Sequence, residues 1–275
     1  MQRFCLCGLL VALLALPASA QLTEEVPFIT TPDNVTLEML RVARVGASDH
    51  VIDLGSGDGR IVITAARRFG ATGLGVEIVP DLVTQSRQSA AAAGVGDRVR
   101  FETQDLFVTD LSRATVVTMY LLPEFNLKLR PALLTLKPGT RIVSHDWDMG
   151  EWKPDQTTVV AVPDKKVGLE KSSKVHLWTI PANIGGLWCG TGALRDFSLQ
   201  VTQQFQDVEA TLTRGQRVRL IQGRMNGAVL QTQSTRVGSL ELTLEGTQLR
   251  ISGGEGTLAL ARGAAFGRAS GATCA

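Results

Sequence analysis

The sequence predicts an α/β protein with a doubly wound, mostly parallel sheet, followed by a small all-β antiparallel barrel or sandwich. Two observations predict this division. From residue 26 to about 180, short apolar strands alternate with segments whose apolar residues recur at helical spacing, which is typical of a parallel sheet covered by helices. After Pro181, apolar and polar residues alternate between turns, which indicates antiparallel strands with one buried face.

In the first predicted domain, residues 26–181, strands are expected where short apolar runs end in turn residues. These runs lie at 51–54, 72–76, 99–103, 114–119 and 141–144. Helices are expected at 58–69, 80–92 and 123–136, after a first helix that Asp33 can cap. Two more strands, at 157–162 and 175–180, follow each other without a helix. We expect these two to form an antiparallel edge of the sheet.

The second predicted domain, residues 187–275, reads as a meander of six to eight strands. Turn pairs separate the strands, and Asn183 to Gly186 is the predicted linker. The turn pairs are Arg214-Gly215, Asn226-Gly227, Glu245-Gly246 and Gly253-Gly254. Barrel closure would bring the two ends of this domain together, and we expect a disulfide between Cys189 and Cys274 there.

The composition excludes some classes of protein. The 275 residues are 44% hydrophobic and 20% charged, enough apolar side chain for a sizeable core, so global disorder is excluded. The net charge of +2 gives no indication of nucleic-acid binding, and no such partner is expected. Three histidines and four cysteines stand in no metal-binding spacing, so no metal site is expected.

The first twenty residues are predicted to be a secretory signal peptide. Arg3 precedes an apolar run at 4–16, and Ala18-Ser19-Ala20 fits the small-x-small cleavage rule. The run is short for ~30 Å of hydrocarbon, so no membrane span is expected after cleavage. The sequence therefore predicts an exported protein, periplasmic or extracellular.

The chemistry is expected at the turn between the first strand and its helix, residues 53–59 (DLGSGDG). Its glycines permit positive φ and close approach of a ligand to the backbone, at the carboxyl ends of the strands where open α/β sheets bind ligands. Glu77 ends the second strand and can bond both hydroxyls of a ribose. Asp105 ends the third and can accept a hydrogen bond from an adenine amino group.

Two cofactor classes use this geometry. Dinucleotide enzymes carry G-x-G-x-x-G with pyrophosphate on the helix N-terminus, whereas this turn reads G-x-G-x-G and continues with Arg60. Asp58 stands where the phosphate would lie. An acidic pocket favours a cationic, phosphate-free ligand, and S-adenosyl-L-methionine has a sulfonium, an ammonium and a ribose. The alternative is that the glycines only form a tight turn and Asp58 only caps a helix.

Residues 51–59 resemble motif I of the class I S-adenosylmethionine-dependent methyltransferases. A closer resemblance is to the ATP synthase c-subunit lysine methyltransferases and their bacterial relatives. It is carried by residues 26–32 (VPFITTP), 53–63 (DLGSGDGRIVI), 120–123 (YLLP) and 137–144 (KPGTRIVS), and it spans about residues 26–180. It implies a Rossmann-like fold and methyl transfer from S-adenosylmethionine to a lysine amine of a protein or peptide.

The resemblance also implies roles for individual residues. The segment after the fourth strand lies where this fold places its acceptor-side loop, so Tyr120 and Glu124 are the predicted catalytic residues that orient the acceptor amine. The alternative is that Pro123-Glu124 is an ordinary helix start. The predicted cofactor-binding residues are Asp53, Gly55, Ser56, Gly57, Gly59, Glu77 and Asp105.

Other features of the sequence have simpler interpretations. His145-Asp146 is interpreted as a surface loop that could touch substrate, and Lys165 as part of a solvated hairpin. The alternative function is an exported protein without turnover, which either binds S-adenosylmethionine or holds an apolar ligand in its β barrel.

Overall fold

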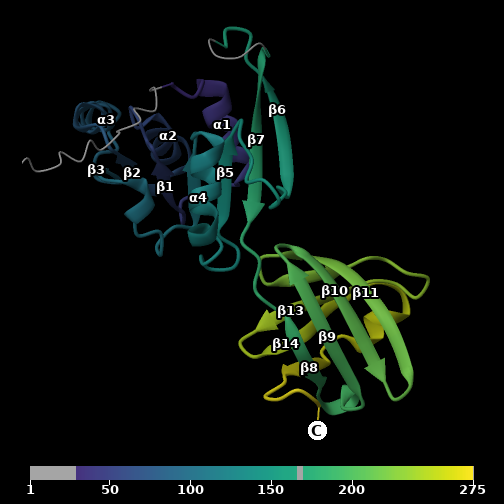
Figure 1. The fold of residues 1–275 in the computed structure, drawn as a ribbon. Coiled ribbons are helices and arrows are strands. Elements are labelled where there is room, and N and C mark those ends of the chain that lie inside the picture. Colours follow the sequence, from purple (N-terminus) through teal and green to yellow (C-terminus); the bar gives the residue numbers. More distant parts are fainter. Residues whose placement is uncertain (1–28, 166–169, 275) are drawn as a thin grey trace, which may run out of the picture.

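A computed structural model describes residues 29–165 and 170–274 of the chain. The predicted signal peptide and Val26 to Phe28 lie outside the described residues. The chain forms an α/β unit followed by a β barrel, joined near residue 182 (Figure 1). Within the described ranges, no helix is long and apolar enough to cross a membrane.

The α/β unit is built on a seven-stranded sheet of order β3-β2-β1-β4-β5-β7-β6. The first five strands are parallel, and β7 pairs antiparallel with both β5 and β6. This confirms the predicted doubly wound sheet and its antiparallel edge. The strands are β1 (His50–Leu54), β2 (Thr72–Glu77), β3 (Val99–Thr103), β4 (Val116–Met119), β5 (Arg141–His145), β6 (Gln156–Ala161) and β7 (Ser172–Thr179).

Helices cover both faces of this sheet. One face packs on α1 (Asp33–Val42), α2 (Arg60–Phe69) and α3 (Pro80–Ala92). The other packs on α4 (Pro123–Leu133), whose Leu129 and Leu133 are buried. Two predicted starts differ slightly. Asp33 lies inside α1 and makes no capping bond, because Pro32 holds the cap position. The α2 helix begins at Arg60, because Gly59 has a left-handed φ of 78°.

The second unit is a closed antiparallel barrel of order β10-β11-β12-β13-β14-β15-β8-β9, which confirms the barrel form of the prediction. Its interior is filled by side chains such as Trp188, Leu199, Leu230 and Leu249, all nearly or fully buried. The strands are β8 (Gly186–Gly190), β9 (Phe197–Gln204), β10 (Asp207–Arg214), β11 (Arg217–Asn226), β12 (Val229–Thr232), β13 (Leu240–Glu245), β14 (Gln248–Gly254) and β15 (Ala265–Arg268).

The antiparallel direction of β7 decides where the barrel lies. Because β7 runs opposite to β5, its last residue lies at the amino end of the parallel strands. The chain therefore enters the barrel at the end of the sheet opposite the carboxyl ends of β1 to β5, as the arrowhead of β7 shows (Figure 1). The barrel does not cover the end of the sheet where a cofactor binds in this fold.

A hydrogen-bonded junction joins the two units. The indole nitrogen of Trp152, a buried side chain of the α/β unit, donates to Gln206 of the β9–β10 turn at 2.8 Å. Gln206 in turn donates to Asp155 at 3.1 Å, and Arg224 of β11 pairs with the same carboxylate at 3.0 Å. The predicted linker is packed here as well, because Ile184 belongs to the barrel core.

The two cysteines form the expected disulfide. Cys189 lies in β8, and its Cα is 5.5 Å from that of Cys274. The bond ties β8, the first strand of the barrel, to the end of the chain. It lies beside the pairing of β15 with β8 that closes the barrel. It closes a loop with a sequence separation of 85 residues, which restricts the unfolded chain.

We expect the oxidised protein to release no free thiol from these two cysteines when cells are quenched with an alkylating agent and the protein is denatured. Cys274→Ser should lower the free energy of unfolding by up to ~4–5 kcal/mol, the chain-entropy value for a loop of this length. Denaturant titration of the variant and wild type measures the difference. Two alkylated thiols per wild-type chain would contradict the bridge and an oxidising compartment together.

Candidate active site

The predicted cofactor-binding residues lie at the carboxyl ends of β1, β2 and β3. Gly55, Gly57 and Gly59 have φ values of 74°, 52° and 78°, so the turn after β1 uses the left-handed region that favours glycine. A Cβ on Gly55 would lie 3.0 Å from the side chain of Leu121. The turn therefore leaves the backbone bare where β1 and β4 lie side by side in the sheet.

Asp53 is the buried acid of the site. Its carboxylate accepts a 2.7 Å hydrogen bond from the hydroxyl of Thr118, a fully buried residue of β4. The pKa of Asp53 is raised to about 7, mainly by burial and to a smaller extent by the negative charges of Asp58 and Glu77, while the hydrogen bond from Thr118 acts in the opposite direction. Asp53 is thus held at the balance between its neutral and ionised forms near neutral pH.

Glu77 binds the glycine turn directly. One carboxylate oxygen accepts from the backbone nitrogen of Gly57 at 3.0 Å, and the other accepts from Ile78 and Val79 at 2.8 and 3.1 Å. Each oxygen has two lone pairs, so one remains, on the oxygen that Gly57 binds, and it can accept from a ribose hydroxyl. The structure therefore brings Glu77 to the turn, as predicted.

Two other predicted residues take less direct positions. Ser56 is buried and its hydroxyl has no partner among the described residues. It points toward Gly75 of β2, where a Cβ would lie 2.7 Å away. Asp105 is exposed and accepts from the backbone nitrogen of Phe107 at 2.8 Å, so one carboxylate oxygen is left for a ligand. Their contacts with a cofactor stay predictions.

Asp58 does not have the role in the acidic pocket that the sequence predicts. Its carboxylate is paired with the guanidinium of Arg60 at 2.6 Å, so it does not add an unpaired negative charge to the pocket. Arg60 also donates to the backbone carbonyl of Thr31 at 2.8 Å. The pair thus joins the glycine turn to the segment before α1. Because Arg60 is the arginine of this turn and is already paired, it is not free to bind a phosphate.

A second cluster lies at the ends of β4 and β5. The ring of Tyr120 stacks on His145, with centroids 3.9 Å apart. His145 is buried, and its ring nitrogens lie 3.2 Å from the Thr31 hydroxyl and 2.9 Å from the Ser173 hydroxyl. Burial lowers the pKa of His145 to about 4 despite the nearby carboxylate of Asp146. The surface-loop interpretation of His145 is therefore wrong, because the ring is an uncharged wall of the site.

A cavity of about 230 Å³ opens beside this cluster. Tyr120, His145 and Lys165 line it together with the segment before α1. Lys165 is not the solvated residue that the sequence suggested, since its amine binds Asp146 at 2.8 Å and the Ser172 carbonyl at 2.7 Å. The other lining residues are Ile29, Thr30, Pro32, Asp164 and Ser173.

Glu124, the second predicted catalytic residue, does not line this cavity. It lies in the first turn of α4 and is exposed. Among the described residues, no side-chain hydrogen bond or ion pair involves it. Its catalytic role stays a prediction that this arrangement does not support.

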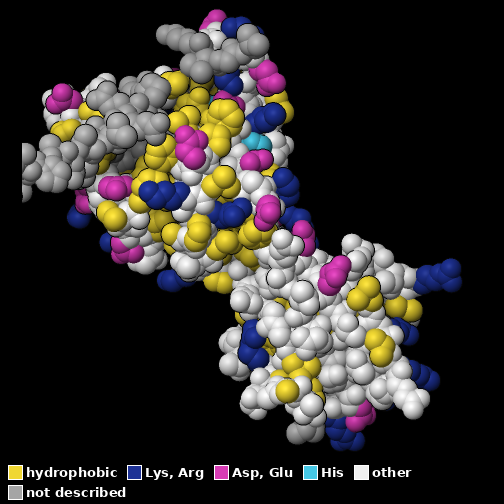
Figure 2. Space-filling view, viewed as in Figure 1, with side chains coloured by type: hydrophobic (Ala, Val, Ile, Leu, Met, Phe, Trp, Pro, Cys, Tyr) yellow, Lys and Arg dark blue, Asp and Glu magenta, His cyan; other side chains and the backbone are white. Residues whose placement is uncertain are grey.

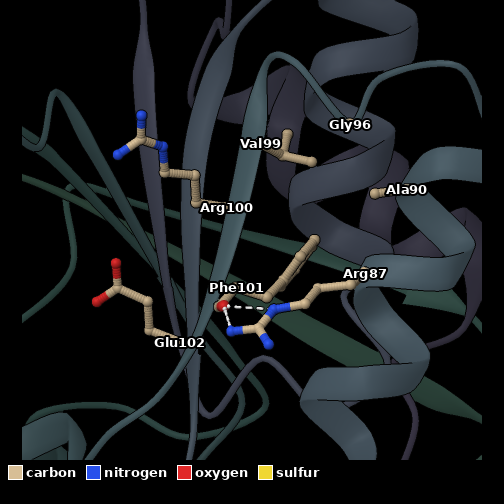
Figure 3. A pocket seen from close by; sticks show the side chains of 7 residues that line it. All are labelled: Arg87, Ala90, Gly96, Val99, Arg100, Phe101 and Glu102. Atoms are coloured by element: carbon tan, nitrogen blue, oxygen red, sulfur yellow. Dashed lines mark hydrogen bonds between the residues drawn. The ribbon is translucent and has the colours of Figure 1, made fainter.

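A larger hollow of about 330 Å³ lies elsewhere, between α3 and the edge strand β3 (Figure 3). Arg87 in its wall donates to the carbonyl of Phe101 at 3.1 and 2.6 Å, so its charge is already engaged. None of the predicted site residues lines it. Phe101 instead packs against the glycine turn. Its ring lies so close to Gly59 that a Cβ there would be 2.7 Å from it.

Sequence reasoning missed several residues that hold the site. Thr118 is a polar residue inside an otherwise apolar strand, and that interruption is a signal that could have identified it. Ser86 of α3 donates to the carbonyl of Gly57 at 2.9 Å and fixes the turn. No local pattern marks Ser86, or the pairing of Thr31 with His145 across 114 positions of sequence.

These features fit S-adenosyl-L-methionine. The turn exposes backbone, three acids end adjacent strands, and the arginine of the turn is already paired. A ligand with two cationic groups and a ribose suits that set of donors and acceptors better than a phosphate ester. Asp53, Glu77 and Asp105 are the residues expected to hold it. Within the part of the chain that the structure describes, no cluster of three or more side chains could hold a metal ion.

Comparison with known proteins agrees with this geometry. Residues 53–156 match the family described as ANTKMT methyltransferase domain. A protein-lysine N-methyltransferase of Saccharolobus islandicus (strain REY15A) is 43% identical over 141 residues, which cover 50% of this chain and 86% of that protein. An ATP synthase c-subunit lysine N-methyltransferase of Xenopus laevis is 38% identical over 156 residues, covering 54% of this chain and 67% of that protein.

A solved structure is also similar. It is an RNA methyltransferase from Salinibacter ruber in complex with S-adenosyl-L-homocysteine, 54% identical, with a TM-score of 0.51, covering 57% of this chain and 96% of that chain. The fold and these similarities define a class I S-adenosylmethionine-dependent methyltransferase. Within that class, the chain belongs to the family of protein-lysine N-methyltransferases that includes the Saccharolobus islandicus and Xenopus laevis proteins. The family match ends at residue 156 and so does not include the barrel.

We expect Glu77→Ala to weaken binding of S-adenosylmethionine by roughly 1.5–3 kcal/mol, the scale of a charge-assisted hydrogen bond. The variant loses the ribose partner and also the acceptor for Gly57. Calorimetric titration measures the affinity, and Glu124→Ala is a matched control because that acid lies outside the site. Equal affinity of the Glu77 variant and wild type would refute the ribose role.

Asp53 should make cofactor affinity depend on pH. The folded pKa of about 7 lies above the unfolded value of ~3.9, so its contribution to the free energy of unfolding falls as pH rises from about 4 to about 7. A cationic ligand favours the ionised carboxylate. Wild-type affinity should therefore be roughly tenfold weaker at pH 6 than at pH 8 through this group.

Asp53→Asn keeps the bond with Thr118 and removes the titration. We expect the pH dependence of the variant to be correspondingly flatter than that of wild type when both are titrated in the same buffers. Subtracting the two profiles also removes the titration of the ligand's own amine. Parallel profiles would show that Asp53 does not change its charge on binding.

Proposed function

We propose that this protein methylates the ε-amine of lysine in a protein substrate, and that it acts outside the cytoplasm. The relatives that share the family support the acceptor, since both carry the name of a lysine N-methyltransferase. The predicted signal peptide and the disulfide between Cys189 and Cys274 support the compartment, because disulfides persist where the surroundings are oxidising.

The observation that carries the proposal is the cavity beside Tyr120. His145 is neutral and Lys165 is paired with Asp146, so neither residue adds a free charge to its walls. The aromatic and aliphatic part of its lining suits the long apolar stem of a lysine side chain. Asp164 lines the same cavity and is exposed, so it offers a carboxylate to an incoming ammonium.

The cavity also favours the reactive form of the acceptor. Lysine has a reference pKa of ~10.4 and must lose a proton before its nitrogen can attack. Burial between uncharged rings disfavours the ammonium and lowers that pKa. The bound cofactor carries its methyl group already activated as a sulfonium, so alignment and exclusion of water are the tasks left to the protein.

Tyr120 is the residue we assign to alignment. Stacking on His145 fixes the ring. Burial, followed by the charge of Asp146, raises the pKa of the Tyr120 hydroxyl, so the group stays protonated near neutral pH. Its oxygen can then accept a hydrogen bond from the amine and direct the lone pair of the nitrogen. His145 acts through Tyr120 as a positioning residue.

Incubation with methyl-labelled S-adenosylmethionine and cell-envelope proteins should label lysine, which acid hydrolysis and mass spectrometry identify as methyl-lysine. Tyr120→Phe keeps the stacking and removes the hydroxyl. We expect turnover to fall roughly ten- to hundredfold, the effect of losing one aligned hydrogen bond, with cofactor affinity unchanged.

Glu124→Gln should retain turnover, because Glu124 lies outside the cavity. RNA is the comparison substrate, since the Salinibacter ruber relative is named an RNA methyltransferase. Label transferred to RNA and not to protein would reject the lysine assignment while leaving the methyltransferase class intact.

A further inference from the structure

The barrel has an end that faces away from the methyltransferase sheet. Successive strands run up and down, so the β9–β10 and β11–β12 turns lie at the junction, where Gln206 bonds Trp152 and Gly227 accepts from Ala182. The alternate connections lie at the other end. We name this end the distal surface, and it consists of residues 191–196, 214–220, 234–239 and 255–263.

The distal surface is strongly basic. Residues 187–275 contain nine arginines and no lysine. Two acids, Asp196 and Glu255, accompany the six arginines of the distal surface, which leaves it a net charge of +4. In the space-filling view, dark blue side chains, which in the barrel are arginines, lie along this end (Figure 2). The six are Arg195, Arg214, Arg217, Arg219, Arg236 and Arg262.

Most of these arginines have no partner in the described part of the chain. Arg195 and Arg214 are each 4.0 Å from Asp196. No side-chain hydrogen bond or ion pair of the described residues involves Arg217, Arg219, Arg236 or Arg262, all of which are exposed.

The other three arginines of the barrel differ. Arg224 pairs with Asp155 and Asp207, Arg250 pairs with Glu245, and Arg268 donates to two backbone carbonyls. Paired arginines hold the barrel together, whereas the unpaired ones gather at the distal surface. This separation indicates an external anionic partner rather than a structural role.

Large aliphatic side chains are exposed among the unpaired arginines. Leu260 is 89% exposed, Leu220 69%, Val218 64% and Val237 39%. Val218 and Leu220 alternate with Arg217 and Arg219 along the first residues of β11. Apolar side chains interspersed with cations are typical of surfaces that enter the headgroup region of a bilayer.

We propose that the distal surface docks on a membrane rich in anionic phospholipids, with the arginines on lipid phosphates and the aliphatic side chains in the interface. Guanidinium groups bind phosphate in a bidentate manner, and each cation near an anionic surface strengthens binding roughly fivefold. Nucleic acid fits less well, because the exposed apolar side chains are aliphatic and offer no aromatic ring for stacking of bases. Docking by this end leaves the crevice of the sheet facing away from the bilayer.

Co-sedimentation of the purified protein with vesicles tests the proposal. Wild-type protein should bind vesicles of equal parts phosphatidylglycerol and phosphatidylcholine, and binding should weaken as salt is raised. It should not bind phosphatidylcholine alone. Replacing Arg217, Arg219, Arg236 and Arg262 together by Gln should lower the affinity more than a hundredfold. Leu260→Ser should lower it severalfold without changing the salt dependence.

The matched control replaces four exposed arginines of the α/β unit, Arg67, Arg68, Arg100 and Arg113, by Gln. This control removes the same charge and should keep vesicle binding. Cofactor affinity of both fourfold variants should equal that of wild type, which verifies folding of the α/β unit, and unchanged resistance to limited proteolysis verifies folding of the barrel. Equal loss in both variants, no wild-type binding to anionic vesicles, or preference for an oligonucleotide of matched charge would each overturn the proposal.

Discussion

The guanidinium of Arg60 connects the two halves of the active site. It binds the carboxylate of Asp58, inside the glycine turn, and the carbonyl of Thr31, before α1. The hydroxyl of Thr31 then meets the ring of His145, on which Tyr120 stacks. This chain of contacts joins the glycine turn to the cavity beside Tyr120.

That connection also explains why the segment before α1 matters. Ile29 to Pro32 contains no helix or strand, yet it lines the acceptor cavity. Its backbone is held from one side by Arg60 and its Thr31 side chain from the other by His145. An irregular segment can serve as the wall of a site when both its polar groups and its apolar side chains have partners.

Much of this arrangement could be predicted from sequence. Apolar runs and glycines located β1 to β5, the turn and the strand-end acids, because those features are local in sequence. The ion pair of Asp58 with Arg60 could not be read from the sequence, where Arg60 only marks the departure from a phosphate-binding motif. The burial of His145 was missed because it depends on Thr31 and Ser173, which lie far away in the chain.

Prediction of the barrel from sequence was limited in a similar way. Alternation of apolar residues and turn pairs predicted its strands and the disulfide, but its position depends on the direction of one strand. Since β7 runs against β5, the barrel lies at the amino end of the sheet. A parallel β7 would have delivered the chain to the end where the cofactor turn lies. Strand direction at a sheet edge is a tertiary property that local periodicity does not encode.

The absence of lysine from residues 187–275 has a further consequence under the proposed function, in which the acceptor is an amine. A guanidinium keeps its proton at any physiological pH, so the nine arginines supply positive charge without supplying a nucleophile. The barrel therefore carries its positive charge without offering a lysine amine to the methyltransferase unit.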